Sequence, residues 1–168
     1  CYCMEKKVDY SRNSGNRIKQ VNKLLQADHL GKLPPQAIDI EQAVLGALMI
    51  DNESLSDTID AVQVEYFYKI EHQKTFEAIT NLFNKTQPID ILTVTEELKK
   101  MGQLEFVGGL AYISELTNNV ASASNTEFHA RIIAEKFIKR SLISISNNII
   151  GDAFNDTIDI FDLLNTAE

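Results

Sequence analysis

The longest uninterrupted helical pattern of this chain is NTEFHARIIAEKFIKRSLISISNNIIG, residues 125–151. It opens with Asn125 and Thr126, residue types that cap helices, and holds no proline or glycine before Gly151. The stretch therefore predicts one helix of about 26 residues, roughly 40 Å long at the usual rise per residue. Because the mean helix is less than half as long, we expect this one to extend beyond the rest of a small domain.

Apolar residues occur on more than one side of this predicted helix. They are Phe128, Ile132, Ile133, Phe137, Ile138, Leu142, Ile143, Ile145, Ile149 and Ile150. A helix that packs against a single neighbour buries one narrow apolar stripe. Because the apolar residues here occupy more than one side, we expect a returning helix and a second subunit to cover them. Residues 159–168 have the composition of that returning helix, cut short at Glu168. We call residues 125–168 the arm, and expect a helical hairpin.

The predicted self-association face of the arm consists of Ile132, Phe137, Leu142, Ile145 and Ile149. If Phe137 belongs to that face, Phe137→Ala should weaken self-association more than folding.

Residues 34–124 are expected to form a small globular head of short helices. The first has Asp39 as its N-cap and an apolar stripe at Ile40, Val44, Ala47 and Leu48. Further helices are predicted from Leu55 to Val62, Glu71 to Asn84, Asp90 to Met101 with Gly102 as a stop, and Gly108 to Leu116. The rings of residues 66–68 and Phe76 are expected in the core. The fold class is therefore all-α.

Charge divides the chain near Leu33. Residues 1–33 hold seven Lys or Arg against three Asp or Glu, so the other 135 residues hold nine against twenty-one. The basic N-terminal segment is expected to be mobile, since it has few apolar residues to bury. The acidic remainder repels phosphates, which predicts little direct binding of nucleic acid by this domain and favours a basic protein partner.

The sequence carries no recognisable catalytic or ligand-binding pattern. No glycine begins a phosphate-binding loop, and His29, His72 and His129 are scattered without metal-ligand spacing, so structural roles are expected for all three. Glu96 and Glu97, beside Lys99 and Lys100, are typical of a solvated helix face. No catalytic residue, cofactor site or metal site is predicted. Without a run of about 18 apolar residues to span a bilayer, we expect a cytoplasmic location.

Several segments match, in order and spacing, the motifs of one protein family. The segment PQAIDIEQAVLGALMID, Pro35 to Asp51, has the acidic residue followed by AVLG that marks the family's first helix. The next matches are Phe67, Tyr68 and His72, then Ile79 and Leu82, then Pro88, Ile89 and Asp90, and then Leu98, Gly102 and Leu104. The last are Gly108, Gly109, Tyr112, Ile113 and Leu116, followed on the arm by Asn125, His129, Ala130, Ile132, Ile133, Glu135, Lys136, Arg140 and Leu142.

From about Pro35 onward the chain thus resembles the N-terminal domain of DnaB-type replicative helicases, with His129 where tyrosine is usual. The resemblance implies a helical head and a helical hairpin, six of which form a collar of three dimers above a ring of motor domains. It also implies that primase, and in some systems a helicase loader, binds this collar. ATP and Mg²⁺ would belong to a motor domain after Glu168, which this chain lacks.

A second hypothesis is a stand-alone helical adaptor or decoy that binds primase or a loader and blocks the native collar. The gene sequence beyond Glu168 distinguishes the two, because a phosphate-binding loop there indicates a fragment and a stop codon a free-standing protein. The sequence alone leaves open the oligomeric state, the surface used for primase and the role of the basic N-terminal segment.

Overall fold

The computed structural model describes residues 32–51, 55–118, 125–155, 157, 159–161 and 164. Residues 35–168 form one compact unit and residues 1–34 another. The predicted basic segment lies almost entirely outside the described residues, and the division of the chain into three parts stays a prediction.

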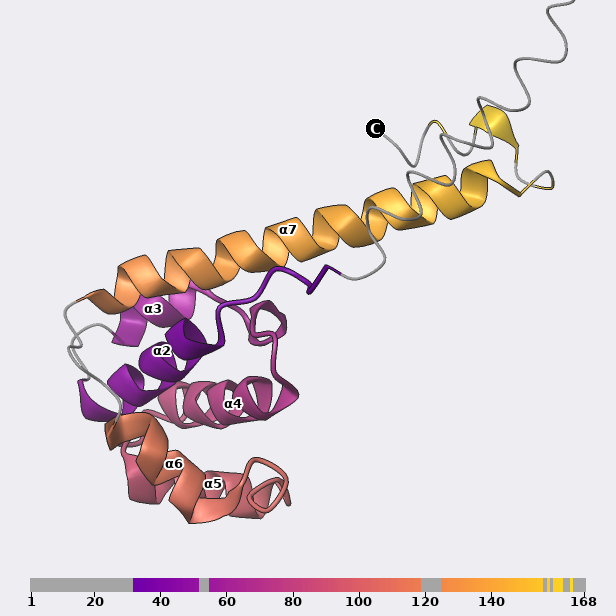
Figure 1. Cartoon of the computed structure of the whole chain (residues 1–168). Coiled ribbons are helices and arrows are strands. Elements are labelled where there is room, and N and C mark those ends of the chain that lie inside the picture. The colour runs from indigo at the N-terminus through magenta and orange to yellow at the C-terminus, as the bar shows by residue number, and fades with distance from the viewer. Residues whose placement is uncertain are drawn as a thin grey trace, which may run out of the picture. The chain divides into compact units, whose positions relative to one another are not determined.

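All regular structure in the described ranges is helical, which confirms the predicted all-α class (Figure 1). The elements are α2 (Ile38–Ile50), α3 (Leu55–Ala61), the short 3-10 helix η1 (Val64–Tyr66), α4 (Ile70–Asn84), α5 (Ile91–Lys100), α6 (Gly109–Asn118) and α7 (Thr126–Ala153). The predicted long helix is present, and it continues through Gly151 to Ala153.

Helix α2 is the centre of the head, because it packs against α4, α6 and α7. Its predicted stripe is confirmed, with Val44, Ala47 and Leu48 buried and Ile40 half-buried. The predicted N-cap is wrong. The helix begins at Ile38 after Ala37, so Asp39 lies in the first turn. Its carboxylate still stabilises the helix there, because it interacts favourably with the positive end of the helix dipole.

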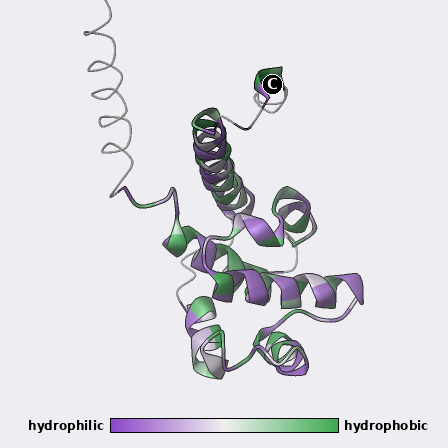
Figure 2. Ribbon diagram, turned by 90° about the vertical axis from the view of Figure 1, so that its right-hand side faces the viewer, coloured by the Kyte–Doolittle hydropathy of each residue, from purple (hydrophilic) through white to green (hydrophobic). Residues whose placement is uncertain are grey.

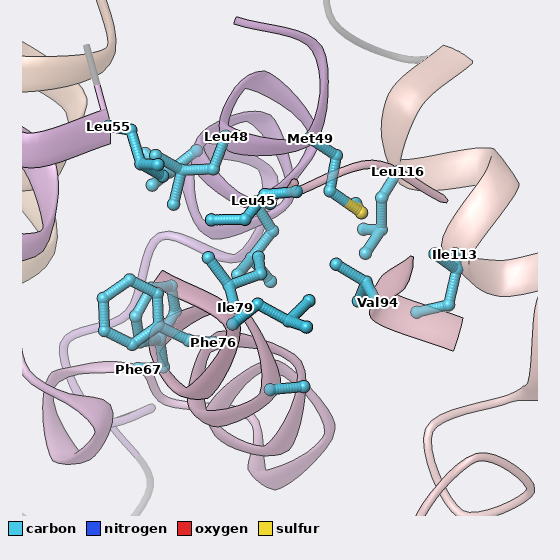
Figure 3. Packing of buried hydrophobic residues seen from close by; sticks show 14 of the residues in the cluster. Leu45, Leu48, Met49, Leu55, Phe67, Phe76, Ile79, Val94, Ile113 and Leu116 are labelled. Carbon is cyan, nitrogen blue, oxygen red and sulfur yellow. The ribbon is translucent and has the colours of Figure 1, made fainter. Parts of the chain in front are cut away.

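Side chains from α2, α4, α5 and α6 form a single hydrophobic core (Figure 3). The predicted burial of Phe67 and Phe76 is confirmed, and their ring centroids lie 4.9 Å apart. A core shared by helices far apart in sequence explains why these short helices of the head hold together, since isolated helices of this length are marginal in water.

Gly102 ends α5 as predicted. Its φ of +68° is the left-handed conformation that glycine adopts without strain. The N–H of Gly102 donates to the carbonyl of Lys99, and that of Gln103 to the carbonyl of Leu98, which are the two bonds of a Schellman motif. The same two bonds end α4, where Thr86 takes the left-handed position at φ +53°.

One sequence expectation about α5 is wrong. Glu96 is solvated and faces Lys99, as expected, whereas Glu97 is only 4% exposed. The Oε1 atom of Glu97 accepts a hydrogen bond of 2.6 Å from Nζ of Lys85, which follows α4. Glu97 therefore joins two helices: Lys100 of its own helix lies 3.9 Å away, and its shorter contact is to Lys85, twelve residues earlier in the chain.

Asp90 is the N-cap of α5, and its side chain accepts hydrogen bonds from the backbone N–H groups of Leu92 and Thr93 while Thr93 Oγ1 accepts from the N–H of Asp90. The hydrogen bond from the backbone of Thr93 is the main cause that lowers the pKa of Asp90 below its ordinary value of 3.8; partial burial opposes it. The carboxylate form is therefore the one that stabilises the fold.

We expect Asp90→Ala to lower the free energy of unfolding by about 1 kcal/mol at pH 7, because two backbone N–H groups lose their acceptor. A folded-state pKa below the unfolded value makes this contribution present above the unfolded pKa, and it is lost as the pH falls through the folded value. The difference between the two proteins in urea unfolding should thus shrink at acid pH. Asp90→Asn, which keeps an acceptor, is the control and should stay near wild type at pH 7.

Candidate assembly surface

One side of α7 faces the head. Thr126, Ala130 and Ile133 are buried, and Phe137 and Arg140 are half-buried. The spacings of four and three residues place all of them on one side of a helix. We call this set the head-facing stripe, and it ends at Arg140.

Phe137 anchors the outer end of that stripe. Its ring stacks on Tyr66 of η1, with centroids 4.5 Å apart and an angle of 20° between the planes. Such aromatic pairs contribute beyond the area they bury. Phe137 therefore contributes to the contact between α7 and the head.

Beyond the head, α7 carries a second apolar stripe on a different side. It consists of Ile138, Leu142, Ile145 and Ile149, again at spacings of four and three, and we call it the outward stripe. Ile138, Leu142 and Ile145 are 54%, 58% and 50% exposed. At 3.6 residues per turn the outward stripe is centred roughly 130° around the helix from the head-facing stripe. Packing on the head therefore leaves it uncovered.

The side of α7 that carries the outward stripe is polar along the first half of the helix. Glu127, Arg131 and Glu135 occupy it, and Glu127 pairs with Arg131 at 2.6 Å. The hydrogen bond from Lys139 is the main cause that holds the pKa of Glu135 below its usual range, so this carboxylate is ionised at neutral pH. The outward stripe thus begins at Ile138, close to where the head contacts end. Figure 1 shows α7 continuing there past the head helices, and Figure 2 shows hydrophobic and hydrophilic residues distributed around it.

The five residues predicted as a self-association face do not share one side of α7. Leu142, Ile145 and Ile149 lie on the outward stripe, whereas Phe137 lies on the head-facing stripe and Ile132 is half-buried on a third side. Self-association stays a prediction, and we expect Leu142, Ile145 and Ile149 to be its main contributors.

The predicted returning helix lies largely outside the described residues. Of residues 159–168 the structure describes Asp159, Ile160, Phe161 and Leu164, and the last three side chains are exposed.

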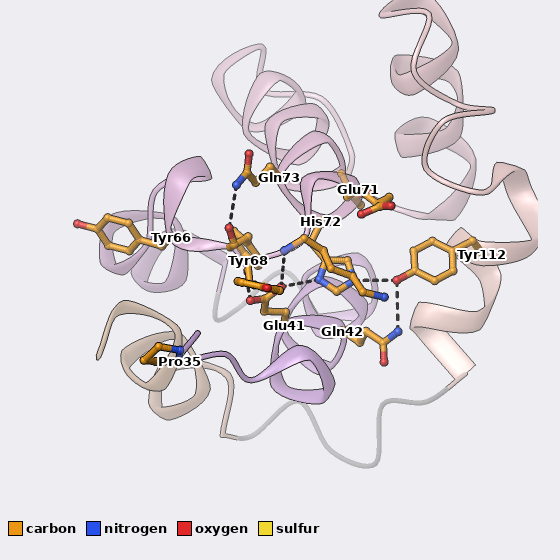
Figure 4. A network of polar contacts seen from close by, with 12 residues as sticks. Pro35, Glu41, Gln42, Tyr66, Tyr68, Glu71, His72, Gln73 and Tyr112 are labelled. Atoms are coloured by element: carbon orange, nitrogen blue, oxygen red, sulfur yellow. Dashed lines mark hydrogen bonds and ion pairs between the residues drawn. The ribbon is translucent and has the colours of Figure 1, made fainter. Parts of the chain in front are cut away.

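A buried polar network in the head was missed by the sequence analysis. His72 is fully buried, and its Nδ1 atom lies 2.6 Å from Oε2 of Glu41, which is 2% exposed (Figure 4). Its Nε2 atom lies 2.7 Å from the hydroxyl oxygen of Tyr112, and that oxygen accepts a hydrogen bond from Nε2 of Gln42 at 3.2 Å. The other carboxylate oxygen of Glu41 accepts from the N–H of Tyr68 at 2.7 Å. The network joins α2, α4 and α6.

One proton arrangement satisfies every member of this network. Gln42 donates to the oxygen of Tyr112, the Tyr112 hydroxyl donates to Nε2 of His72, and Nδ1–H of His72 donates to Glu41. The histidine is then neutral, with both ring nitrogens bonded. This supports a structural role for His72 and leaves no free ring nitrogen for a metal.

Gly108 makes room for this network. It has a φ of +105°, and a Cβ atom at this position would lie 2.9 Å from Cβ of Tyr112. Glu41 and Tyr112 lie 31 and 40 residues from His72 in the sequence, so no local pattern predicts these contacts. All three residues nevertheless belong to the family motifs.

Within the part of the chain that the structure describes, no group of three or more His, Cys, Asp or Glu is placed to hold a metal ion. None of the helices described has the length and apolar character needed to cross a membrane.

The all-α head with one long helix running past it matches solved structures of replicative helicases. The crystal structure of the N-terminal domain of DnaB helicase from Mycobacterium tuberculosis matches with a TM-score of 0.75 and 29% identity, over 80% of this chain and 95% of that one. A DnaB-like replicative helicase, studied with its interactions with primase, matches with a TM-score of 0.65 and 26% identity, over 78% of this chain and 31% of that one.

The chain belongs to the DnaB-like helicase N terminal domain family, which it matches over residues 33–135. It is 46% identical over 138 residues to the replicative DNA helicase DnaB of Rhodothermus marinus and 39% identical over 138 residues to that of Treponema pallidum. These matches cover 82% of this chain, but only 15% and 32% of the two relatives. The chain thus spans a third or less of the length of these proteins.

Proposed function

We propose that this chain is the collar domain of a replicative DNA helicase, and that it self-associates through the outer half of α7. The observation that carries the proposal is the outward stripe. The side of α7 on which it lies is polar beside the head and apolar beyond it, and three of the four residues of the stripe are at least half exposed. A second copy of the same helix is the simplest complementary surface, because an apolar heptad-like spacing is self-complementary.

The proposal extends to a protein partner. The chain carries a net charge of −8, with the acidic excess in residues 34–168. A negative surface steers a basic protein toward it and repels DNA. Together with the primase interactions studied for the DnaB-like relative, this supports primase as a partner of the collar and a helicase loader as a further one. ATP, Mg²⁺ and translocation on DNA would belong to the rest of the parent protein.

The self-association is tested by charging the outward stripe. Leu142→Glu combined with Ile145→Glu should weaken self-association by roughly 100-fold, since two large apolar side chains would no longer be buried between copies. Sedimentation velocity over a range of concentrations measures the effect. Both side chains are at least half exposed, so the thermal midpoint of unfolding should hardly change.

Ser144→Glu is the matched control, because Ser144 is exposed on the same stretch of α7 but lies away from the outward stripe. It should self-associate as the wild type does. A wild-type chain that remains monomeric at the highest attainable concentration would refute the proposal.

A further inference from the structure

The side chain of Arg140 joins α7 to two parts of the head that are distant in sequence. Its guanidinium donates one hydrogen bond to the carbonyl oxygen of Pro35, at 2.9 Å, and one to that of Tyr66, at 2.6 Å. The central carbon of the same group lies 5.5 Å from the ring centroid of Tyr68 and 5.8 Å from that of Phe137. We call these contacts the Arg140 bridge.

The bridge needs an arginine. Pro35 lies in the segment before α2 and Tyr66 is the last residue of η1, so the two carbonyl groups belong to separate pieces of backbone. A planar guanidinium can donate to both while its face lies against aromatic rings, whereas a lysine ammonium is a compact group without this fork or this planar face.

Because of its position, the bridge can control the direction of α7. Arg140 is the last member of the head-facing stripe, and most side chains after it are exposed. From Arg140 to Ala153 the helix continues for about 20 Å. A tilt of about 10° at the bridge would move that end by roughly 3 Å, given the rise of a helix. Closely packed side chains do not tolerate a shift of this size.

We propose that Arg140 is a positioning residue that sets the direction in which α7 leaves the head, and thereby presents the outward stripe at the angle that a second copy requires. The role of Arg140 in the direction of α7 follows from the bridge alone. Its role in presenting the outward stripe rests on the proposed self-association.

The direction of α7 is measured by double electron–electron resonance between spin labels on Glu115→Cys in α6 and Asn148→Cys in α7, both exposed positions. Cys1 and Cys3 are replaced by serine, and labelled chains are diluted with unlabelled ones so that only distances within a chain are recorded. The wild type should give one narrow distribution. In Arg140→Lys and Arg140→Met the distribution should broaden or shift by about 3 Å or more, as the helix geometry implies.

Lys139→Met is the matched control, because it removes a neighbouring cation whose partner, Glu135, lies on α7 itself. It should leave the distances unchanged. Arg140→Lys should unfold near the wild-type temperature, since the buried core of the head is untouched. Distributions in both Arg140 variants as narrow as in the wild type, and centred at the same distance, would overturn the proposal. Loss of the folded head in both variants would also overturn it, because the bridge would then be a folding determinant.

Sedimentation of the same proteins separates this inference from the proposed function. If the distances change but the wild type never self-associates, the proposed function fails and the role of Arg140 in setting the direction of α7 remains. If the wild type self-associates through the outward stripe but the distances do not respond to Arg140, this inference alone fails.

Discussion

Replacing His72 with alanine is expected to lower the free energy of unfolding by about 3 kcal/mol or more, because the buried carboxylate of Glu41 and the hydroxyl of Tyr112 would each lose a hydrogen-bond partner. Glu41 would keep its hydrogen bond from the N–H of Tyr68, but its Oε2 atom would lose the partner at 2.6 Å. The hydroxyl of Tyr112 would lose its acceptor at the same time. Urea unfolding at neutral pH measures the change.

His129→Ala is the control for this prediction, because His129 is only half-buried, on α7, and its loss should change stability much less. The double variant Glu41→Ala, His72→Ala adds a second check. Removing both partners should destabilise the head by less than the sum of the two single changes, because no unpaired carboxylate is left. Additive losses would contradict the coupling of these two residues.

Phe76→Ala should lower the free energy of unfolding by about 3 to 5 kcal/mol, the range for removing a buried phenylalanine ring. Phe76 is 2% exposed and packs on Phe67 in the centre of the core. Leu48→Ala, at a fully buried position on α2, should lower it by about 2 to 5 kcal/mol for the same reason. Both changes remove transfer free energy and leave a cavity.

Phe128→Ala is the matched control for the aromatic change, because Phe128 is 63% exposed at the start of α7. Its removal should alter stability by no more than about 0.5 kcal/mol. Equal losses for Phe76→Ala and Phe128→Ala, measured by chemical unfolding, would show that the core is placed wrongly.

The helices were predictable because each carries its own local signals. Asp90 and Gly102 mark the two ends of α5, and the absence of a break between Thr126 and Gly151 predicts α7. The errors concern what a helix end or a side chain meets in space. Asp39 was placed as a cap although α2 begins one residue before it, and Glu97 was placed in solvent although Lys85 approaches it from the end of α4.

From the sequence, only the apolar composition of the candidate surface could be predicted. A long helix with apolar residues on several sides must be covered by more than one partner, and this follows from the sequence of α7. Which of those sides meets the head does not follow, because Phe137 and Leu142 are equally apolar. The Tyr66 ring and the Arg140 bridge decide it, since they turn one side of α7 toward η1.

Local patterns in the sequence were enough to predict the all-α class, the order of the helices and the approximate length of α7, because helix periodicity, capping residues and glycine stops act over a few neighbouring residues. The family motifs can likewise be read from the sequence alone. Three features could be seen only in the folded protein: His72 lies between Glu41 and Tyr112, Arg140 joins α7 to the head, and the outward stripe begins at Ile138. These features depend on contacts between residues up to 105 positions apart. Such contacts are selected by packing of the whole head, and no local pattern encodes them.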